Sequence, residues 1–385
     1  MSDLSLPPLT IWAHTLCRST LATYLALARD YGTDVEIIIC GNANPKHRKK
    51  AGFSASEFPM AQFVALEPST EDALELLKAR PDRLHMFAAY HGTSLAEALL
   101  DQAVAMGAKY FIASEAPQNM EKSPLRRVAK EVWVPTLLRW RVRRSVANSL
   151  FFVCYSGEAP RRLHQVGWPD TKIEPFGYYP PSLSNARPKL DLPARPDATR
   201  DAPLQFLATG IHDDHKSPVT LVEAAAILKQ QGIAARFRCT IAGSGKQTEA
   251  MKRAVARDGL PVDFSGFVSL EKLIQLYRGA DVFVGTDVDE PWGIRINDAI
   301  LLGCPVICST GMGAHTDILR YKLGWAFDSG SAEDLARLMR RLIEDRGTVL
   351  SVNQFVAENT ELSPDSQAQR LRQIIERRLC RRQAA

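Results

Sequence analysis

The amino-acid sequence predicts an α/β protein made of two Rossmann-like, doubly wound domains that face a cleft. In the first half, short apolar runs alternate with segments of helical period, which is typical of a parallel sheet covered by helices on both faces. A stretch rich in Pro, Ser and Arg near the middle has no hydrophobic period and is typical of a linker. A second alternation follows it, and 385 residues are too many for one hydrophobic core.

The period of the apolar residues locates the elements of the first half. The expected strands are 9–13, 34–40, 84–87, 109–113 and 149–154, and the expected helices are 16–31, 70–79 and 95–106. The first strand is not followed by a G-x-G-x-x-G turn, so no dinucleotide site is expected there. We place the domains at 1–180 and 204–365, the linker at 181–203 and a basic helix at 366–385.

The stretch 281–317 carries the most informative pattern of the second half. A β-branched strand at 281–286 runs into an acidic turn, a helix spans 294–302, and a second strand starts at Val306. Glu290 therefore lies just after a strand and Asp298 lies on the next helix, where open α/β sheets place their ligands. The sequence predicts that these two carboxylates border one pocket.

This stretch resembles the signature of the retaining GT-B glycosyltransferases of family 4, in which a Glu, seven intervening residues and a second Glu run into a helix that ends in Gly-x-Pro-Val. This chain departs from the signature at the second acid, which is an Asp and one methylene shorter. Here the acids are Glu290 and Asp298, and the end of the helix reads Gly303-Cys304-Pro305-Val306. The resemblance implies the GT-B fold, with Glu290 facing the sugar of a nucleotide-sugar donor and Asp298 holding the ribose diol. It also implies that the first domain binds the acceptor and that the last helix packs back onto that domain.

A second segment is similar to the family's diphosphate-binding motif, with two departures. Gly210 follows the strand that starts at Leu204, and Lys216 stands at the family's lysine position. Ile211 replaces the family's arginine and Ser217 replaces its glycine. A departing diphosphate needs positive charge or oriented N–H groups. Arg295 and the amino end of the helix after Gly293 are the candidates to supply them.

Three further segments agree with the family in spacing and order. Gly243 and Gly245 form a Gly-x-Gly turn, and Phe267 and Val268 follow a short strand in a loop that the resemblance places at the base. A Gly-rich turn at 311–314 follows the last strand of the pattern. The donor-binding set implied in this way is Gly210, His212, Lys216, Gly243, Gly245, Phe267, Val268, Glu290, Trp292, Gly293, Ile294, Arg295 and Asp298.

The catalytic candidates are Glu290, Lys216 and Glu115. Glu115 follows the strand at 109–113, near the position where the family often carries a histidine, so it is a candidate for contact with the acceptor or the sugar. The alternative is an exposed loop acid without a role. His14, His85 and His91 also flank strand ends, and for each we expect a hydrogen-bonded structural role rather than catalysis.

The segment 121–147 is basic and aromatic, with eight Lys and Arg residues, two Glu residues and two Trp residues. An amphipathic basic helix bearing Trp and Leu is typical of contact with an anionic membrane. We expect that contact over 122–144, where a lipid-linked or diphosphate-linked acceptor would also be attracted. The alternative is a solvated helix packed on the first sheet. Nucleic acid is not expected as a partner, because no nucleic-acid motif accompanies the charge.

No metal or cofactor is expected. Asp287-Val288-Asp289 and His212-Asp213-Asp214-His215 look like ligand sets, yet adjacent side chains cannot all point at one ion, and neither cluster lies in the context of a GT-A enzyme. Seven cysteines without a CxxC pair fit reduced thiols in a cytoplasm. The sequence has neither a run of about 18 apolar residues nor a secretion signal, so we expect the protein in the cytoplasm, at the inner face of the cell membrane.

The function predicted from these patterns is transfer of a sugar, with retention, from a nucleotide-diphosphate sugar to an acceptor hydroxyl, without a metal. The expected acceptor is a glycan or a lipid-linked sugar, in bacterial surface polysaccharide or glycolipid assembly. Two alternatives stay open. One is a nucleotide-sugar epimerase or hydrolase on the same fold. The other is a catalytically silent nucleotide-sugar binder or membrane scaffold, which the departures at Ile211 and Asp298 keep in view.

Overall fold

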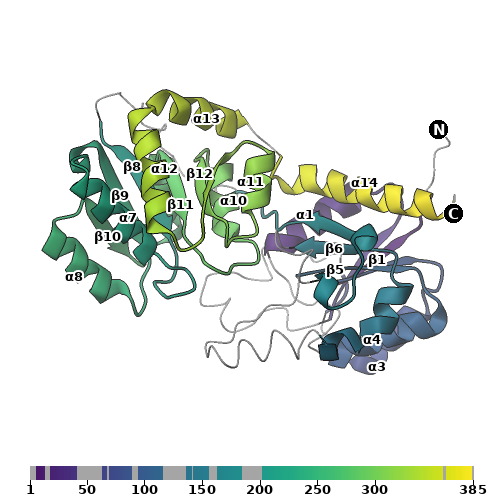
Figure 1. The fold of residues 1–385 in the computed structure, drawn as a ribbon. Coiled ribbons are helices and arrows are strands. Elements are labelled where there is room, and N and C mark those ends of the chain that lie inside the picture. Colours follow the sequence, from purple (N-terminus) through teal and green to yellow (C-terminus); the bar gives the residue numbers. More distant parts are fainter. Residues whose placement is uncertain are drawn as a thin grey trace. The chain divides into compact units, whose positions relative to one another are not determined.

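The computed structural model of the chain divides into two compact units (Figure 1). Unit 1 comprises Met1–Tyr178 and Pro364–Ala385, and unit 2 comprises Tyr179–Ser363. The structure describes residues 6–13, 18–40, 63–66, 69–88, 94–115, 136–140, 142–155, 163–183, 202–358 and 361–383. Most of the predicted linker, together with His14, His91 and residues 116–135, lies outside these ranges.

Unit 1 is built on a parallel sheet of seven strands in the order β3-β2-β1-β4-β5-β6-β7. The strands are β1 (Leu9–Ala13), β2 (Val35–Ile39), β3 (Phe63–Leu66), β4 (Leu84–Phe87), β5 (Tyr110–Ser114), β6 (Phe152–Tyr155) and β7 (Ile173–Phe176). The helices are α1 (Arg18–Asp30), α3 (Thr70–Lys78), α4 (Ser94–Met106) and α14 (Pro364–Gln383), with a 3-10 turn at Asp170–Lys172. The central strands are buried along their length because helices cover the sheet.

α14 lies in unit 1 although it is last in the sequence. It packs against α1, and Arg29 of α1 pairs with Asp365 at 2.7 Å. At the edge strand β7, Arg377 of α14 pairs with Glu174 at 2.8 Å, and the Arg370 guanidinium lies 5.3 Å from the ring centre of Phe176. These contacts tie the end of the chain to the first sheet.

His85 has a structural role in β4. Its Nδ1 accepts a hydrogen bond of 3.2 Å from the indole N–H of Trp12, and the side chain is fully buried. Burial lowers the pKa of His85 to about 4 because the charged form loses its hydration. The imidazole is therefore neutral and belongs to the core, as expected from the sequence.

Unit 2 is built on a parallel sheet of six strands in the order β10-β9-β8-β11-β12-β13. The strands are β8 (Leu204–Thr209), β9 (Phe237–Ala242), β10 (Val262–Gly266), β11 (Val282–Gly285), β12 (Val306–Ser309) and β13 (Gly324–Phe327). The helices are α7 (Val219–Gln230), α8 (Thr248–Asp258), α9 (Leu270–Gly279), α10 (Ile294–Leu301), α11 (His315–Arg320), α12 (Ala332–Glu344) and α13 (Arg346–Glu358), with a 3-10 turn at Ala234–Arg236.

The order of the second sheet places its functional loops together. β8 and β11 are neighbours at its centre, where the strand order reverses direction. Loops that follow parallel strands at such a reversal diverge and leave room for a ligand. The loops after β8 and β11 are the two segments in which the sequence predicts Lys216 and Glu290.

The fold class predicted from the sequence is confirmed, with two parallel α/β sheets of the GT-B type. Two short edge strands in unit 1, β3 and β7, were not predicted. β7 contains Pro175, which cannot donate to a ladder and is tolerated because β7 pairs only with β6. Among the described residues, no helix is both long enough and apolar enough to cross a membrane.

Candidate active site

Glu290 lies in the loop between β11 and α10, where the backbone holds it in place. Its N–H donates to the carbonyl of Gly311 at 2.8 Å, and its own carbonyl accepts from the N–H of Gly313 at 3.0 Å. Gly293, at φ 93°, then ends the loop in a left-handed conformation before Ile294 starts α10, which favours glycine. The turn after β12 thus positions the acid in the turn after β11.

A lysine and a histidine converge on the Glu290 carboxylate. The Lys216 ammonium donates to Oε2 of Glu290 and also lies 2.8 Å from Oδ1 of Asp287. Nε2 of His215 is 3.2 Å from the same Oε2. Glu290 is 18% exposed and Lys216 is 22% exposed, so this charged group is largely shielded but still reached by solvent.

The loop that carries Lys216 is braced by hydrogen bonds to its backbone. Oδ1 of Asp213 accepts from the N–H groups of His215 at 3.1 Å and of Lys216 at 2.9 Å. The Thr286 hydroxyl donates to the Lys216 carbonyl at 2.8 Å, and the Val288 N–H donates to the His215 carbonyl at 3.0 Å. The loops after β8 and β11 are therefore joined through their main chains.

Arg295 is the second cation at this site. It lies in the first turn of α10, and its guanidinium donates to Oδ2 of the fully buried Asp287. Its Nη1 also fills the space beside Gly210, because a Cβ at Gly210 would lie only 2.5 Å from it. A guanidinium therefore covers the end of β8, next to the position where the resembling family carries an arginine and this chain has Ile211.

The charges of the site shift two pKa values in opposite directions. Burial works to raise the pKa of Glu290, but the His215 hydrogen bond and the positive charges of Lys216 and Arg295 lower it to about 2. The hydrogen bond with Glu290 raises the pKa of His215, against burial and the charge of Lys216. Glu290 is therefore ionised, and His215 holds its proton to a higher pH than a free histidine.

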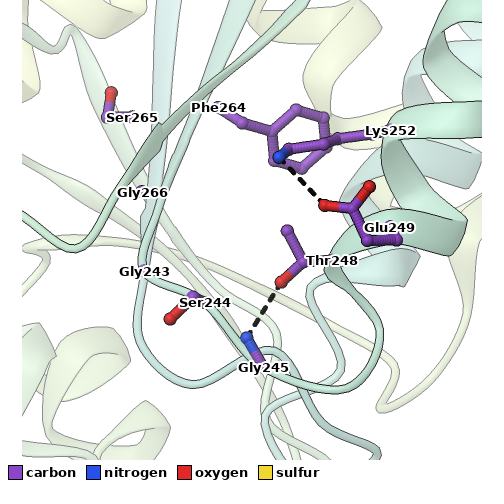
Figure 2. Close-up of a pocket in the computed structure, with 9 residues that line it drawn as sticks. All are labelled: Gly243, Ser244, Gly245, Thr248, Glu249, Lys252, Phe264, Ser265 and Gly266. Carbon is purple, nitrogen blue, oxygen red and sulfur yellow. Dashed lines mark hydrogen bonds and ion pairs between the residues drawn. The ribbon is translucent and has the colours of Figure 1, made fainter.

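A cavity of about 550 Å³ opens where β9 and β10 end (Figure 2). It is lined by Gly243, Ser244, Gly245, Thr248, Glu249, Lys252, Phe264, Ser265 and Gly266. Gly243 has φ 123° and packs so closely on the Gly210 carbonyl that a side chain has no room. Figure 2 shows the Glu249–Lys252 ion pair, 3.0 Å long, and the hydrogen bond of 2.9 Å between the Gly245 N–H and the Thr248 hydroxyl.

Residues 196–361, nearly the whole of unit 2, match the family model described as glycosyl transferases group 1. The chain carries a group 1 glycosyltransferase domain. The match includes every residue placed at the site above, from Gly210 to Gly313.

Curated proteins are similar to part of this chain. The sulfoquinovosyl transferase SQD2 of Arabidopsis thaliana is 30% identical over 128 residues, which are 32% of this chain and 24% of the relative. The amylovoran biosynthesis glycosyltransferase AmsK of Erwinia amylovora is 31% identical over 164 residues, 40% of each chain. A GDP-mannose-dependent mannosyltransferase of Mycobacterium tuberculosis is 28% identical over 203 residues, 52% of this chain and 51% of the relative. The matches thus span between a quarter and a half of these relatives.

Solved structures match the chain along nearly its whole length. HepE from Anabaena, crystallised with UDP, aligns with a TM-score of 0.63 at 14% identity and covers 96% of this chain and 100% of its own. A glycosyltransferase from Rickettsia africae aligns with a TM-score of 0.65 at 15% identity, with 97% and 99% covered. At this identity the likeness establishes the fold.

Within the group 1 domain, several predicted donor-binding side chains are buried. His212 is 1% exposed, and its Nδ1 is 2.8 Å from the Thr248 hydroxyl. Trp292 is 2% exposed and donates its indole N–H to Asn297 at 2.9 Å. Asp298 is 8% exposed on α10. His212 and Trp292 thus have structural contacts, and their role in donor binding stays a prediction.

Other predicted residues are open to solvent. Phe267 is 88% exposed in the loop after β10, and Ile211 is 61% exposed after β8. Val268 is half-buried beside Phe267. The exposed phenyl ring is available for contact with a planar ligand, and it lies next to Gly266 at the edge of the cavity.

Glu115 belongs to unit 1 and has a defined partner there. It follows β5, and its Oε1 accepts a hydrogen bond of 2.7 Å from the Tyr178 hydroxyl. The Tyr178 ring stacks on Tyr155, with centroids 4.8 Å apart, and the Tyr155 hydroxyl is 3.0 Å from that of Tyr24. Glu115 is thus positioned by a tyrosine cluster, which the sequence analysis did not identify.

The site also groups three side chains that could ligate a metal. The ligand atoms of His215, Asp287 and Glu290 all lie within 4.8 Å of one another. His215 comes from one of the two metal-like sequence clusters and Asp287 from the other. The Lys216 ammonium contacts both carboxylates of this group, so a protein cation already offsets their charge. No role was predicted from the sequence for His215 or Asp287, although His215 stands directly before Lys216.

Proposed function

We propose that this protein is a metal-independent glycosyltransferase that moves a sugar, with retention, from a nucleoside diphosphate sugar to an acceptor hydroxyl. The observation that carries the proposal is the pair of cations, Lys216 and Arg295, held beside Glu290 where β8 and β11 end. The group 1 domain and the UDP bound by HepE, which shares the fold, support a nucleoside diphosphate sugar as the donor.

The donor diphosphate has two candidate cations. When the bond between the anomeric carbon and the phosphate oxygen breaks, negative charge accumulates on the leaving diphosphate. Lys216 and Arg295 would exchange part of their contact with Asp287 and Glu290 for contact with those oxygens. Preorganised donors of this kind stabilise developing charge without reorganisation cost. The amino end of α10 adds a favourable dipole.

Glu290 would act on the sugar rather than on the diphosphate. Its carboxylate is ionised because its pKa is lowered to about 2, so it can accept hydrogen bonds from sugar hydroxyls throughout the neutral range. In the proposed reaction the acceptor oxygen bonds to the anomeric carbon from the face that the diphosphate leaves. Attack from this face preserves the anomeric configuration, and the acceptor proton passes to the departing diphosphate. Asp298 remains the candidate for the ribose diol, and Glu115 the candidate for acceptor contact.

The acceptor class rests on the relatives. AmsK takes part in amylovoran biosynthesis, and the mycobacterial enzyme acts on a phosphatidylinositol dimannoside. These names support a glycan or a glycolipid as the acceptor of this chain. The cytoplasmic location expected from the cysteine content remains a prediction.

A catalytically silent nucleotide-sugar binder is the second candidate. It is favoured by Ile211, which is 61% exposed and uncharged at the family's arginine position, and by the burial of Asp298. The close approach of Arg295 to Gly210 favours an active enzyme instead, because it returns a positive charge to that place.

A thermal-shift screen with nucleoside diphosphates and their sugar conjugates tests whether the protein binds such a ligand, which both candidate functions require. A ligand at a hundred times its dissociation constant stabilises the folded state by about 2.7 kcal/mol. We expect one nucleoside diphosphate to raise the melting temperature of the wild type and to have a much smaller effect on Lys216→Gln. No shift with any member of the panel would contradict both candidates.

A further inference from the structure

Residues 136–140 and 142–148 of unit 1 are helical, and the inner face of this segment packs on the unit. Val142 and Val146 are buried in the hydrophobic cluster that contains Phe152 and Trp168, and Leu138 packs against the edge of that cluster. The segment therefore has its own place in the core, and its position does not depend on the residues it exposes.

The outer face of the same helix carries large apolar side chains. Leu137 is 62% exposed and Trp140 is 69% exposed. Their spacing of three residues places them on one side of a helix. In the described part of unit 1, Leu137 and Trp140 are the only large hydrophobic side chains that are exposed. All other exposed large hydrophobic side chains of the described residues lie in unit 2. Exposure of a Trp and a Leu side by side leaves apolar surface in water, which is unfavourable unless something covers it.

The apolar pair is surrounded by positive charge. Arg139, Arg143 and Arg144 are exposed on the same helix, and the Arg143 guanidinium lies 5.7 Å from the centre of the Trp140 ring. The sequence from Thr136 to Asn148 contains no acidic residue. Across the ranges that the structure describes, none of these arginines forms an ion pair with a carboxylate. Within those ranges, the face thus presents positive charge without a carboxylate partner around an apolar centre.

We propose that this face, defined by Leu137, Arg139, Trp140, Arg143 and Arg144, docks on the surface of a bilayer that contains anionic lipid. Trp favours the interfacial region, because its ring is apolar and its N–H is polar. Arginine near an anionic surface strengthens binding roughly fivefold per residue, the equivalent of about 1 kcal/mol. A nucleic acid would use the charge but would leave Leu137 unexplained, and a protein partner would not require an acid-free face.

The inference does not depend on the transfer reaction, because the surface lies in unit 1 and the cation pair lies in unit 2. It complements the proposed function by giving the enzyme a way to meet a lipid-linked acceptor.

Vesicle co-sedimentation of the full chain tests this surface. We expect the wild type to sediment with vesicles containing phosphatidylglycerol at low salt, to bind vesicles of phosphatidylcholine alone far less, and to be released as salt rises. Changing Arg139, Arg143 and Arg144 together to Gln should weaken binding to anionic vesicles roughly a hundredfold. Leu137→Ser with Trp140→Ser should weaken binding at low and at high salt alike, because that contribution is not screened.

Matched controls remove the same chemistry from unit 2. The charge control changes Arg253, Lys272 and Arg341 to Gln, because these exposed cations form no ion pair among the described residues. The apolar control changes Leu350, which is 41% exposed, and Phe355, which is 46% exposed, to Ser. Both controls should bind vesicles like the wild type. Circular dichroism and the nucleotide thermal shift should be unchanged in every variant, which separates this test from that of the donor site.

Two results would overturn the inference. One is the absence of wild-type sedimentation with phosphatidylglycerol vesicles at low salt, including the case in which the protein binds a single-stranded RNA instead. The other is an equal loss of binding in the charge control of unit 2, which would mean that net charge rather than this face attracts the membrane.

Discussion

The Arg295 guanidinium occupies the space that a side chain at Gly210 would fill, with Nη1 only 2.5 Å from the position of a Gly210 Cβ. The positive charge that the resembling family places just after Gly210 therefore comes here from the first turn of α10. Asp287 holds it there, and the backbone at Gly210 has φ 131°, which favours glycine. The uncharged Ile211 is thus accompanied by a guanidinium that reaches Gly210 from another loop.

This relationship predicts a rescue. Arg295→Gln should weaken binding of the nucleoside diphosphate by roughly thirtyfold, since a charge-assisted hydrogen bond contributes about 2 kcal/mol. Ile211→Arg in the Arg295→Gln background should recover most of that affinity, because it restores the charge from the neighbouring loop. Isothermal titration calorimetry of the three proteins measures both steps. If Arg295→Gln binds as tightly as the wild type, the guanidinium does not contact the diphosphate.

His215 predicts a pH-dependent contribution to stability. Its pKa is raised in the folded state by the hydrogen bond with Glu290. The contribution is therefore fully present below the ordinary histidine pKa and is lost as the pH rises through the raised value. At acid pH, the free energy of unfolding of His215→Asn should be lower than that of the wild type. The difference should be less than about 1 kcal/mol, because the group is partly solvated. The two proteins should converge at alkaline pH. A difference that grows with pH would contradict the assignment.

Ser217 predicts a measurable backbone strain. It has φ 43° at the position where the resembling family has glycine, and its hydroxyl is 3.0 Å from that of Thr220. Ser217→Gly and Ser217→Ala both remove this hydrogen bond, but only Gly relieves the left-handed conformation. We expect the Gly variant to be more stable than the Ala variant by about 1 kcal/mol in chemical denaturation. Equal stability would show that the loop carries no strain there.

The sequence was most informative where local pattern and backbone geometry coincide. The helix α10 is bounded by Gly293 and Gly303, both with positive φ, and the two glycines are visible in the sequence. The family resemblance assigned Lys216 and Glu290 to one donor site, and their loops lie together because β8 and β11 are neighbours in the sheet.

Side-chain direction could not be predicted in the same way. His212 and Trp292 follow strands, as ligand-binding residues do, yet both turn into the core. His215, one residue before Lys216, turns toward Glu290 instead. Which way a loop side chain points depends on contacts distant in the sequence, such as that of Trp292 with Asn297 on α10. The strand β7 was missed for a different reason, because Pro175 interrupts the pattern of a strand that lies at the sheet edge.

A chelator distinguishes support of the diphosphate by the Lys216 ammonium from support by a bound metal ion. The group of His215, Asp287 and Glu290 has the composition of a metal site, but the Lys216 ammonium already lies against both of its carboxylates. We expect sugar transfer to continue at an unchanged rate in EDTA. A loss of activity that manganese restores would show that a metal, rather than Lys216, supports the diphosphate.

The most direct test of the account is the product formed from a nucleoside diphosphate α-sugar identified in the thermal-shift screen. With a glycan or glycolipid acceptor, proton NMR of the product should show an α-linkage, and nucleoside diphosphate should be released only when acceptor is present. Glu290→Gln should lower this transfer by about a hundredfold or more, while the affinity for the nucleoside diphosphate changes little, because the carboxylate acts on the sugar. Tight binding of the donor by the wild type without release of nucleoside diphosphate, with any acceptor, would contradict the account. So would a product with a β-linkage.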